Sequence, residues 1–306
     1  MTALFRTVVR WAGRCPRAAA GALTLALALP LAGSALAAAD TPQTVRFASA
    51  DGTVLVGYVF EPSGSPAPHP AVVMLHGRAG PYSSNVNGRC TRVGADIASP
   101  CSATTLSQRH QQWGRYWAEH GHLALLVDSF GPRGKAHGFG RGTHDNPERA
   151  DVNERSVRPL DAIGALRYLR GRSDTDASRI ALQGWSNGGS TALNTIARDA
   201  QEPGFRAALV LYPGCGPKAV IAQAYATTVP LLALIAGGDE EVSPAACERL
   251  LERARRSGSP IAWSTYPGAT HGFDDPCTRP QAIDANRAAR DDAMRRAIDF
   301  ITNPPH

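Results

Sequence analysis

The stretch RIALQGWSNGG, residues 179–189, decides how we interpret the rest of the chain. Its apolar start predicts a buried strand, and the residues that follow it favour a helix. Between them lies the pattern Gly184-x-Ser186-x-Gly188, which in a strand–turn–helix setting is typical of a nucleophile elbow. Side chains at positions 184 and 188 would collide with the neighbouring strand and helix. We therefore predict that Ser186 is a nucleophile whose hydroxyl lies above a sheet, at the N-terminus of a helix. The alternative is an ordinary serine in a glycine-rich turn.

Apolar runs and helix-forming stretches alternate along the rest of the chain. We expect strands at residues 71–77, 122–130, 180–182 (broken at Gly184), 206–213, 230–237 and 261–267. We expect helices around Trp113 and Trp117, at residues 153–170 and 190–200, between residues 213 and 230, and at residues 244–256 and 282–301. Residues 44–62 predict an antiparallel hairpin that turns at Asp51-Gly52. This order predicts an α/β fold in one domain, residues 40–306: a mostly parallel central sheet with helices on both faces and the hairpin at its N-terminal edge.

The first 39 residues have the organisation of a cleaved signal peptide. A basic segment precedes an apolar run, residues 18–31, and a series of small residues follows it. The apolar run contains Pro30 and has no basic flank after it, which argues against the alternative of a transmembrane anchor. We therefore expect an exported protein, periplasmic or secreted. The four arginines of this leader supply most of the formal net charge of +6, so the charge does not indicate nucleic-acid binding.

Export permits disulfide bonds among the cysteines that follow the leader. Cys90 and Cys101 lie in one long polar segment and could close a short ring, and Cys215 and Cys247 could join neighbouring elements at a sheet edge. Cys277 is a competing partner. The cysteines have neither CxxC nor Cys/His zinc spacing, and no phosphate-binding loop is visible, so we expect no metal and no cofactor.

A serine nucleophile needs a base, and the base needs an acid to orient it. Two strands after the elbow end in suitable residues: Asp239 follows residues 230–237, and His271 follows residues 261–267. In open α/β sheets, sites form at such strand ends. We therefore predict that Ser186, Asp239 and His271 form a catalytic triad, with Glu240 and Glu241 as rivals for the acid, because they adjoin Asp239.

Attack on a carbonyl puts negative charge on its oxygen, which needs N–H donors already in place. We expect the backbone N–H groups of Asn187, directly after the nucleophile, and of Arg78, in the turn after residues 71–77. Trp185 could form part of the core or a wall of the substrate pocket. Arg133, in a glycine-rich loop, could bind an anionic substrate group, or pair with a local carboxylate.

Six segments together resemble the dienelactone hydrolase family, a branch of the α/β-hydrolases. They are LHGRAG, VDSFGPRG, RPLDAIGALRYL, RIALQGWSNGG, GGDEEVSP and YPGATHGFDDP. The resemblance extends over residues 44–302 and implies an α/β-hydrolase fold without a large lid, acting on esters or lactones. It assigns the triad to Ser186, Asp239 and His271, and the oxyanion donors to Arg78 and Asn187. The enzymes that give the family its name use cysteine where this chain has Ser186, which favours a general carboxylesterase over a dienelactone substrate.

The expected function is therefore hydrolysis of a small-molecule ester or lactone through an acyl-enzyme. One alternative is a peptidase that uses the same triad, although such enzymes usually carry a gating domain, which a chain of 306 residues does not accommodate. The other is a catalytically silent binding protein on the same scaffold. The intact order of serine, aspartate and histidine argues against this second alternative.

Overall fold

The computed structural model describes residues 41–197, 204–220 and 224–305. The expected signal peptide, residues 1–39, lies outside the described residues. The described chain forms an eight-stranded sheet in the order β1-β2-β4-β3-β5-β6-β7-β8. Pairs β1/β2 and β2/β4 are antiparallel and the remaining pairs are parallel. The strands are β1 (Gln43–Ala48), β2 (Val54–Phe60), β3 (His69–Leu75), β4 (Leu123–Asp128), β5 (Thr175–Trp185), β6 (Ala208–Leu211), β7 (Leu231–Ala236) and β8 (Ile261–Tyr266). The predicted edge hairpin and mostly parallel sheet are confirmed.

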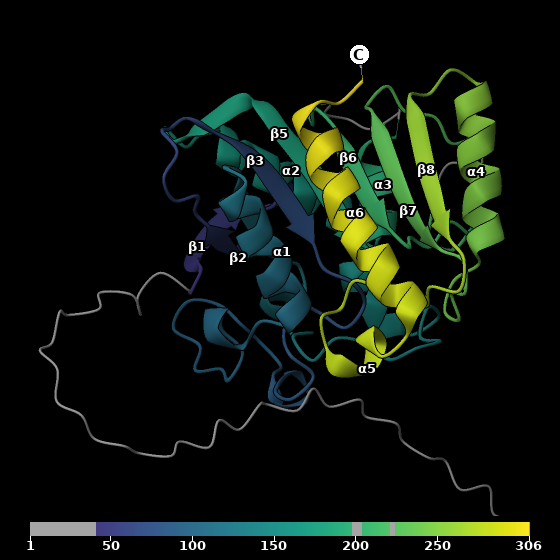
Figure 1. Ribbon diagram of the computed structural model, residues 1–306. Coiled ribbons are helices and arrows are strands. Elements are labelled where there is room, and N and C mark those ends of the chain that lie inside the picture. The colour runs from purple at the N-terminus through teal and green to yellow at the C-terminus, as the bar shows by residue number, and fades with distance from the viewer. Residues whose placement is uncertain (1–40, 198–203, 221–223, 306) are drawn as a thin grey trace, which may run out of the picture.

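Helices cover both faces of this sheet, as the fold prediction requires (Figure 1). On one face lie α1 (Gln108–Glu119) and α6 (Asp284–Thr302), and on the other α2 (Arg158–Arg170), α3 (Asn187–Thr195) and α4 (Pro244–Arg256). The short helix α5 (Thr278–Gln281) precedes α6. Short 3₁₀ turns at Asn87–Arg89, Ala103–Thr105, Gly131–Arg133 and Pro147–Val152 lie in the connections. Among the described residues, no helix is both long and apolar enough to span a membrane.

Alternating side chains of the central strands divide the apolar interior into two layers. In β3, Val73 and Leu75 join the layer under α2, α3 and α4, whereas Val72 and Met74 join the layer under α1 and α6. Trp113 also belongs to the second layer and is completely buried. This arrangement explains why β3 is a continuous apolar run: both of its faces are covered.

Three helix expectations need correction. The helix expected at residues 190–200 is α3, which begins at Asn187 and ends at Thr195, and residues 198–200 lie outside the described residues. The helix expected from residue 153 begins at Arg158, since Pro159 occupies a first-turn position where its missing N–H costs nothing. Between β6 and β7, residues 214–220 and 224–229 contain no helix, while 221–223 lie outside the described residues. Gly214, Gly216 and Pro217 account for this, because glycine and proline are the poorest helix formers.

Both expected disulfides are present. Cys90–Cys101 closes a ring within the long segment between β3 and α1. Cys215–Cys247 joins the loop after β6 to the first turns of α4. The second bridge therefore fastens together two segments that border the carboxyl ends of the parallel strands.

Candidate active site

Ser186 joins β5 to α3 in a strained backbone conformation. Its φ is +52° and its ψ is −116°, a combination that residues with a side chain rarely adopt. A Cβ on Gly184 would overlap the carbonyl oxygen of Gly188, and a Cβ on Gly188 would overlap that of Leu75 at the end of β3. The collisions predicted for these two positions are confirmed. Glycine lets α3 start close to its own strand and to the neighbouring one, which leaves Ser186 at the tip of the turn.

His271 and Asp239 meet Ser186 from two different loops. The Nε2 of His271 lies 2.9 Å from the Oγ of Ser186, and its Nδ1 lies 2.8 Å from Oδ2 of Asp239. The other carboxylate oxygen of Asp239 accepts hydrogen bonds from the backbone N–H groups of Glu241 (2.8 Å) and Val242 (3.0 Å). The side chain of His271 is 9% exposed and that of Asp239 is 1% exposed. The three predicted residues therefore form one continuous chain of contacts with little exposure to solvent.

Backbone hydrogen bonds hold the two loops beside each other. The N–H of Gly237 donates to the carbonyl of Tyr266 (2.8 Å), and the N–H of Gly238 donates to that of Ala269 (2.8 Å). A Cβ on Gly237 would meet the Tyr266 oxygen at 2.7 Å, so only glycine permits this approach. The paired glycines before Asp239 thus bring the acid loop within reach of the histidine loop.

The two glutamates next to Asp239 occupy different positions around the histidine. Oε2 of Glu240 accepts a hydrogen bond from the backbone N–H of His271 (3.0 Å). Oε2 of Glu241 lies 3.8 Å from Nε2, on the side that faces Ser186. Asp239 is thus the residue of the three whose carboxylate lies against Nδ1.

The loop after β3 lies directly against the elbow. A Cβ on Gly77 would be 3.6 Å from the Cβ of Ser186 and 3.5 Å from the carbonyl oxygen of Trp185. Among the hydrogen bonds of the described residues, the backbone N–H groups of Arg78 and Asn187 donate none. These two amides are therefore available, at the positions where the sequence predicted oxyanion donors.

Arg158, which the sequence analysis did not single out, fastens these two loops together from beneath. Its guanidinium is completely buried and donates to the carbonyl of His76 (2.8 Å) and to the side-chain oxygen of Asn187. It also lies over the ring of Phe130 at 5.1 Å. Burial lowers the pKa of Arg158 to about 10. The sequence offered little signal for this role, because an arginine at the start of a helix usually lies in solvent.

Trp185 is a core residue and not a wall of the pocket. Its side chain is completely buried, and its indole N–H donates to Oδ2 of Asp274 (2.8 Å). The indole of Trp113 donates to the same oxygen (2.8 Å), and the two rings are 6.0 Å apart. The possible substrate-binding role of Trp185 is therefore wrong. The side chain before the nucleophile lies in the apolar layer under α1 and α6.

Arg133 likewise does not face the site. Its guanidinium donates to both carboxylate oxygens of buried Asp161 (2.8 and 2.9 Å) and to Asp51 in the β1–β2 turn (3.1 Å). The side chain is only 9% exposed. The alternative of pairing with local carboxylates is correct, and the predicted contact with an anionic substrate group is wrong, because two carboxylates already satisfy this cation.

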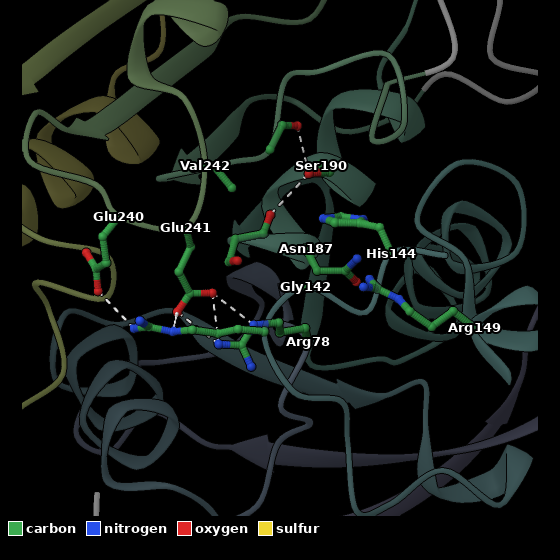
Figure 2. Close-up of a pocket in the computed structure, with 12 residues that line it drawn as sticks. Arg78, Gly142, His144, Arg149, Asn187, Ser190, Glu240, Glu241 and Val242 are labelled. Atoms are coloured by element: carbon green, nitrogen blue, oxygen red, sulfur yellow. Dashed lines mark hydrogen bonds and ion pairs between the residues drawn. The ribbon is translucent and has the colours of Figure 1, made fainter. Parts of the chain in front are cut away.

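A cavity of about 290 Å³ opens beside Ser186. Charged side chains, among them Arg78, Arg149 and Glu241, make up part of its wall (Figure 2). The cavity is lined by Arg78, Arg141, Gly142, His144, Arg149, Ser186, Asn187, Ser190, Gly214, Glu240, Glu241 and Val242. Arg149 is 5% exposed, and burial lowers its pKa. Behind it lies Glu154. Burial raises the pKa of this carboxyl, but the hydrogen bond from His144 and the charge of Arg149 outweigh that effect and hold the pKa below its usual value. The cavity therefore places charged groups of both signs close to Ser186.

The sheet order, the helices on both faces and the strand–turn–helix around Ser186 define the class: this is an α/β-hydrolase fold. The dienelactone hydrolase family model matches residues 106–304, so the chain belongs to the dienelactone hydrolase family. The predicted family and fold are both confirmed. The family is one of hydrolases that act on small molecules. The structural neighbours of this chain include esterases.

Solved structures of similar fold span most of the chain. A protein from Klebsiella pneumoniae subsp. pneumoniae assigned as a dienelactone hydrolase matches with a TM-score of 0.64 and 15% identity, over 85% of this chain and 99% of that one. Propionate-bound esterase 2 of Thermogutta terrifontis matches with a TM-score of 0.57 and 16% identity, over 88% and 98%. A puromycin-hydrolyzing peptidase of Mycobacterium tuberculosis matches with a TM-score of 0.55 and 22% identity, over 86% of this chain but 41% of that one. The TM-scores establish a shared fold, and at such low sequence identities they establish the fold alone.

Proposed function

We propose that this protein is a serine hydrolase that cleaves small carboxylic esters or lactones through an acyl-enzyme. The observation that carries the proposal is the chain of contacts from Ser186 Oγ to His271 Nε2 (2.9 Å) and from His271 Nδ1 to Asp239 (2.8 Å). This arrangement of nucleophile, base and orienting acid activates a hydroxyl that would otherwise remain protonated near neutral pH. The family membership supports the same reaction type.

In the first half of the reaction, Oγ of Ser186 attacks the substrate carbonyl while Nε2 of His271 takes the hydroxyl proton. Asp239 stabilises the imidazolium that results. The backbone N–H groups of Arg78 and Asn187 donate to the oxyanion of the tetrahedral intermediate. The intermediate collapses when the bond between the carbonyl carbon and the leaving oxygen breaks, and the imidazolium returns its proton to that oxygen.

In the second half, water attacks the acyl group on Ser186 and gives one proton to Nε2. The bond between the carbonyl carbon and Oγ then breaks, and the imidazolium proton returns to Oγ. The products are a carboxylic acid and the free enzyme. A lactone follows the same steps, but its ring-opened hydroxyl stays attached to the acyl group throughout, so the single product is a hydroxy acid.

The proposal includes export and a single catalytic domain, residues 40–306. Two disulfides support export, because such bonds persist in oxidising compartments. One sheet that begins at Gln43 and carries all three proposed catalytic residues supports the single domain. Export can be tested on secreted material, by determining its N-terminal residue and its thiol content.

The decisive experiment compares the mature protein with Ser186→Ala on p-nitrophenyl acetate and butyrate, followed by a panel of lactones. We expect kcat to fall by a factor on the order of 10⁴ or more in the variant. A fluorophosphonate probe should label the unmodified protein at Ser186. Equal turnover by the two proteins would refute the nucleophile, and absence of both turnover and labelling would favour a binding protein. Hydrolysis of aminoacyl amides in preference to esters would favour the peptidase.

A further inference from the structure

Glu241 places a second carboxylate beside the proposed catalytic histidine. It lies on the loop after β7, two residues beyond Asp239, and its side chain is 10% exposed at the wall of the cavity (Figure 2). Arg78 donates to both of its oxygens (2.9 Å each), and Nε of Arg141 lies 2.7 Å from Oε1. These contacts fix the direction in which the carboxylate points.

The free side of this carboxylate faces the reacting atoms. Oε2 of Glu241 lies 3.8 Å from Nε2 of His271, and Nε2 is the nitrogen that contacts Oγ of Ser186. A separation of 3.8 Å is too long for a direct hydrogen bond, but a single water oxygen can lie within hydrogen-bonding distance of both atoms. The water of the second half-reaction must lie within hydrogen-bonding distance of Nε2, because it gives its proton to that atom, and a position that also reaches Oε2 meets this requirement.

Glu241 is not required to hold in place the loop after β3, which carries the N–H group of Arg78. Arg78 is independently fastened to Phe139: its guanidinium donates to the Phe139 carbonyl (2.9 Å), and the Phe139 N–H donates to the Arg78 carbonyl (2.8 Å). The buried guanidinium of Arg158 holds the preceding carbonyl of His76. A role confined to the position of the Arg78 N–H would therefore duplicate contacts that already exist.

We propose that Glu241 is a positioning residue for the hydrolytic half of the reaction, and this inference rests on the proposed function. Its Oε2 accepts a hydrogen bond from one O–H of the attacking water, while Nε2 of His271 takes the proton of the other. The water oxygen forms the bond to the acyl carbon, the bond to Oγ of Ser186 then breaks, and the imidazolium proton returns to Oγ. Glu241 gains no proton at any step.

The substitution Glu241→Gln tests this role. In the amide, the oxygen takes the position of Oε1, which has two arginine donors. The NH₂ group replaces Oε2, so it loses the hydrogen bond from Nε of Arg78 and presents a donor toward the water. With p-nitrophenyl acetate in stopped-flow, we expect the acylation rate to change by less than about threefold. We expect deacylation to slow by about tenfold, because orientation of the attacking water is lost. Acyl-enzyme on Ser186 should then accumulate, visible by intact-protein mass spectrometry.

A matched control is Glu252→Gln. Glu252 also accepts from two arginines, Arg255 and Arg256, but it lies on the exposed face of α4. We expect both rates to remain unchanged in this variant. Fluorophosphonate labelling of both variants shows that the site is folded.

A second measurement separates water orientation from a general loss of activity. Methanol has only one O–H, which it must give to Nε2, so it cannot use the hydrogen bond to Glu241. With methanol as competing acceptor, Glu241→Gln should shift the ratio of methyl ester to acid by about tenfold toward the ester. Equal losses in acylation and deacylation, or an unchanged ratio, would overturn the role of Glu241. If the unmodified protein forms no adduct at Ser186, the proposed function itself fails.

Discussion

Two buried aspartates, Asp239 and Asp274, lie in the loops beyond β7 and β8 and behave very differently. The side chain of Asp239 is 1% exposed and that of Asp274 is 0% exposed. Asp239 receives two backbone N–H groups of its own loop and the ring of His271. Asp274 receives side chains from distant elements: the indoles of Trp113 and Trp185, and the hydroxyl of Tyr212 (2.5 Å).

The difference lies in where the donors come from. Local backbone donors fix Asp239 in its loop and leave one oxygen for His271, so this carboxylate can orient a base. The donors of Asp274 come from α1, the end of β5 and the end of β6, so this carboxylate joins the elements beneath the site. Tyr212 belongs to both regions, because its ring also lies 4.8 Å from that of His271. Burial raises the pKa of Tyr212 well above its usual value, so it remains a hydrogen-bond donor.

The largest effect that we expect is on catalysis, from Asp239→Asn. The amide can no longer stabilise the imidazolium or hold the reactive tautomer, so kcat should fall by about 10⁴-fold. The free energy of unfolding in urea should change little, since the two backbone donors keep an oxygen acceptor. A loss of activity smaller than about tenfold would mean that Glu240 or Glu241 serves as the acid instead.

Asp274→Asn should reduce stability strongly and catalysis only slightly, the opposite of Asp239→Asn. Without the charge, the ion pair with Arg109 (3.3 Å) is lost. An amide has only one oxygen for the donors that now share two, which are the indoles of Trp113 and Trp185 and the hydroxyl of Tyr212. We expect the free energy of unfolding to fall by about 3 kcal/mol. The kcat per fluorophosphonate-labelled site should fall by less than about tenfold, because Asp274 contacts no reacting atom. Loss of activity as deep as in Asp239→Asn, with unchanged stability, would remove the distinction between the two aspartates.

The sequence predicted the Asp239 region because its signals are local. The strand ends, the glycine pair at 237–238 and the elbow glycines each act within a few residues, and the order of Ser186, Asp239 and His271 follows the order of their strands. The sheet was predictable for the same reason, since continuous apolar runs mark strands covered on both faces. The bounds predicted for α4 agree with the structure because Pro244 and Gly258 mark its two ends.

The Asp274 region was not predictable, because its contacts join residues far apart in the sequence. Trp113 is 161 residues from Asp274, and no local pattern indicates that these two side chains meet. Arg158 and Arg133 illustrate the same limit: each looks like a surface arginine, and each is buried against groups that only the tertiary fold supplies. The expected helix that residues 214–220 and 224–229 do not form has a different origin, since the glycines and the proline of this segment were visible in the sequence.

The smallest effect that we expect is on the pH dependence of the free energy of unfolding, and it comes from the buried side chain of His110. The ring of His110 packs against Trp185 at 5.3 Å and is 3% exposed. Burial, and then the charge of Arg109, lower the pKa of His110 to about 4. The unfolded chain therefore binds a proton near pH 6.5 that the folded chain takes up only near pH 4, and stability falls as the pH decreases through this window.

His110→Gln should remove this dependence while keeping a donor for the carbonyl of Pro81, which Nδ1 of His110 contacts at 2.9 Å. Between pH 7 and pH 5.5, the free energy of unfolding of the unmodified protein should fall by roughly 1 kcal/mol more than that of the variant. Urea titrations at the two pH values measure the difference. His76, whose pKa burial also lowers, is present in both proteins, and because His110 is the smallest of the causes of its shift, its contribution largely cancels. Equal pH dependence of the two proteins would show that His110 is already positively charged in the folded state, and that its surroundings beside Trp185 tolerate a buried charge.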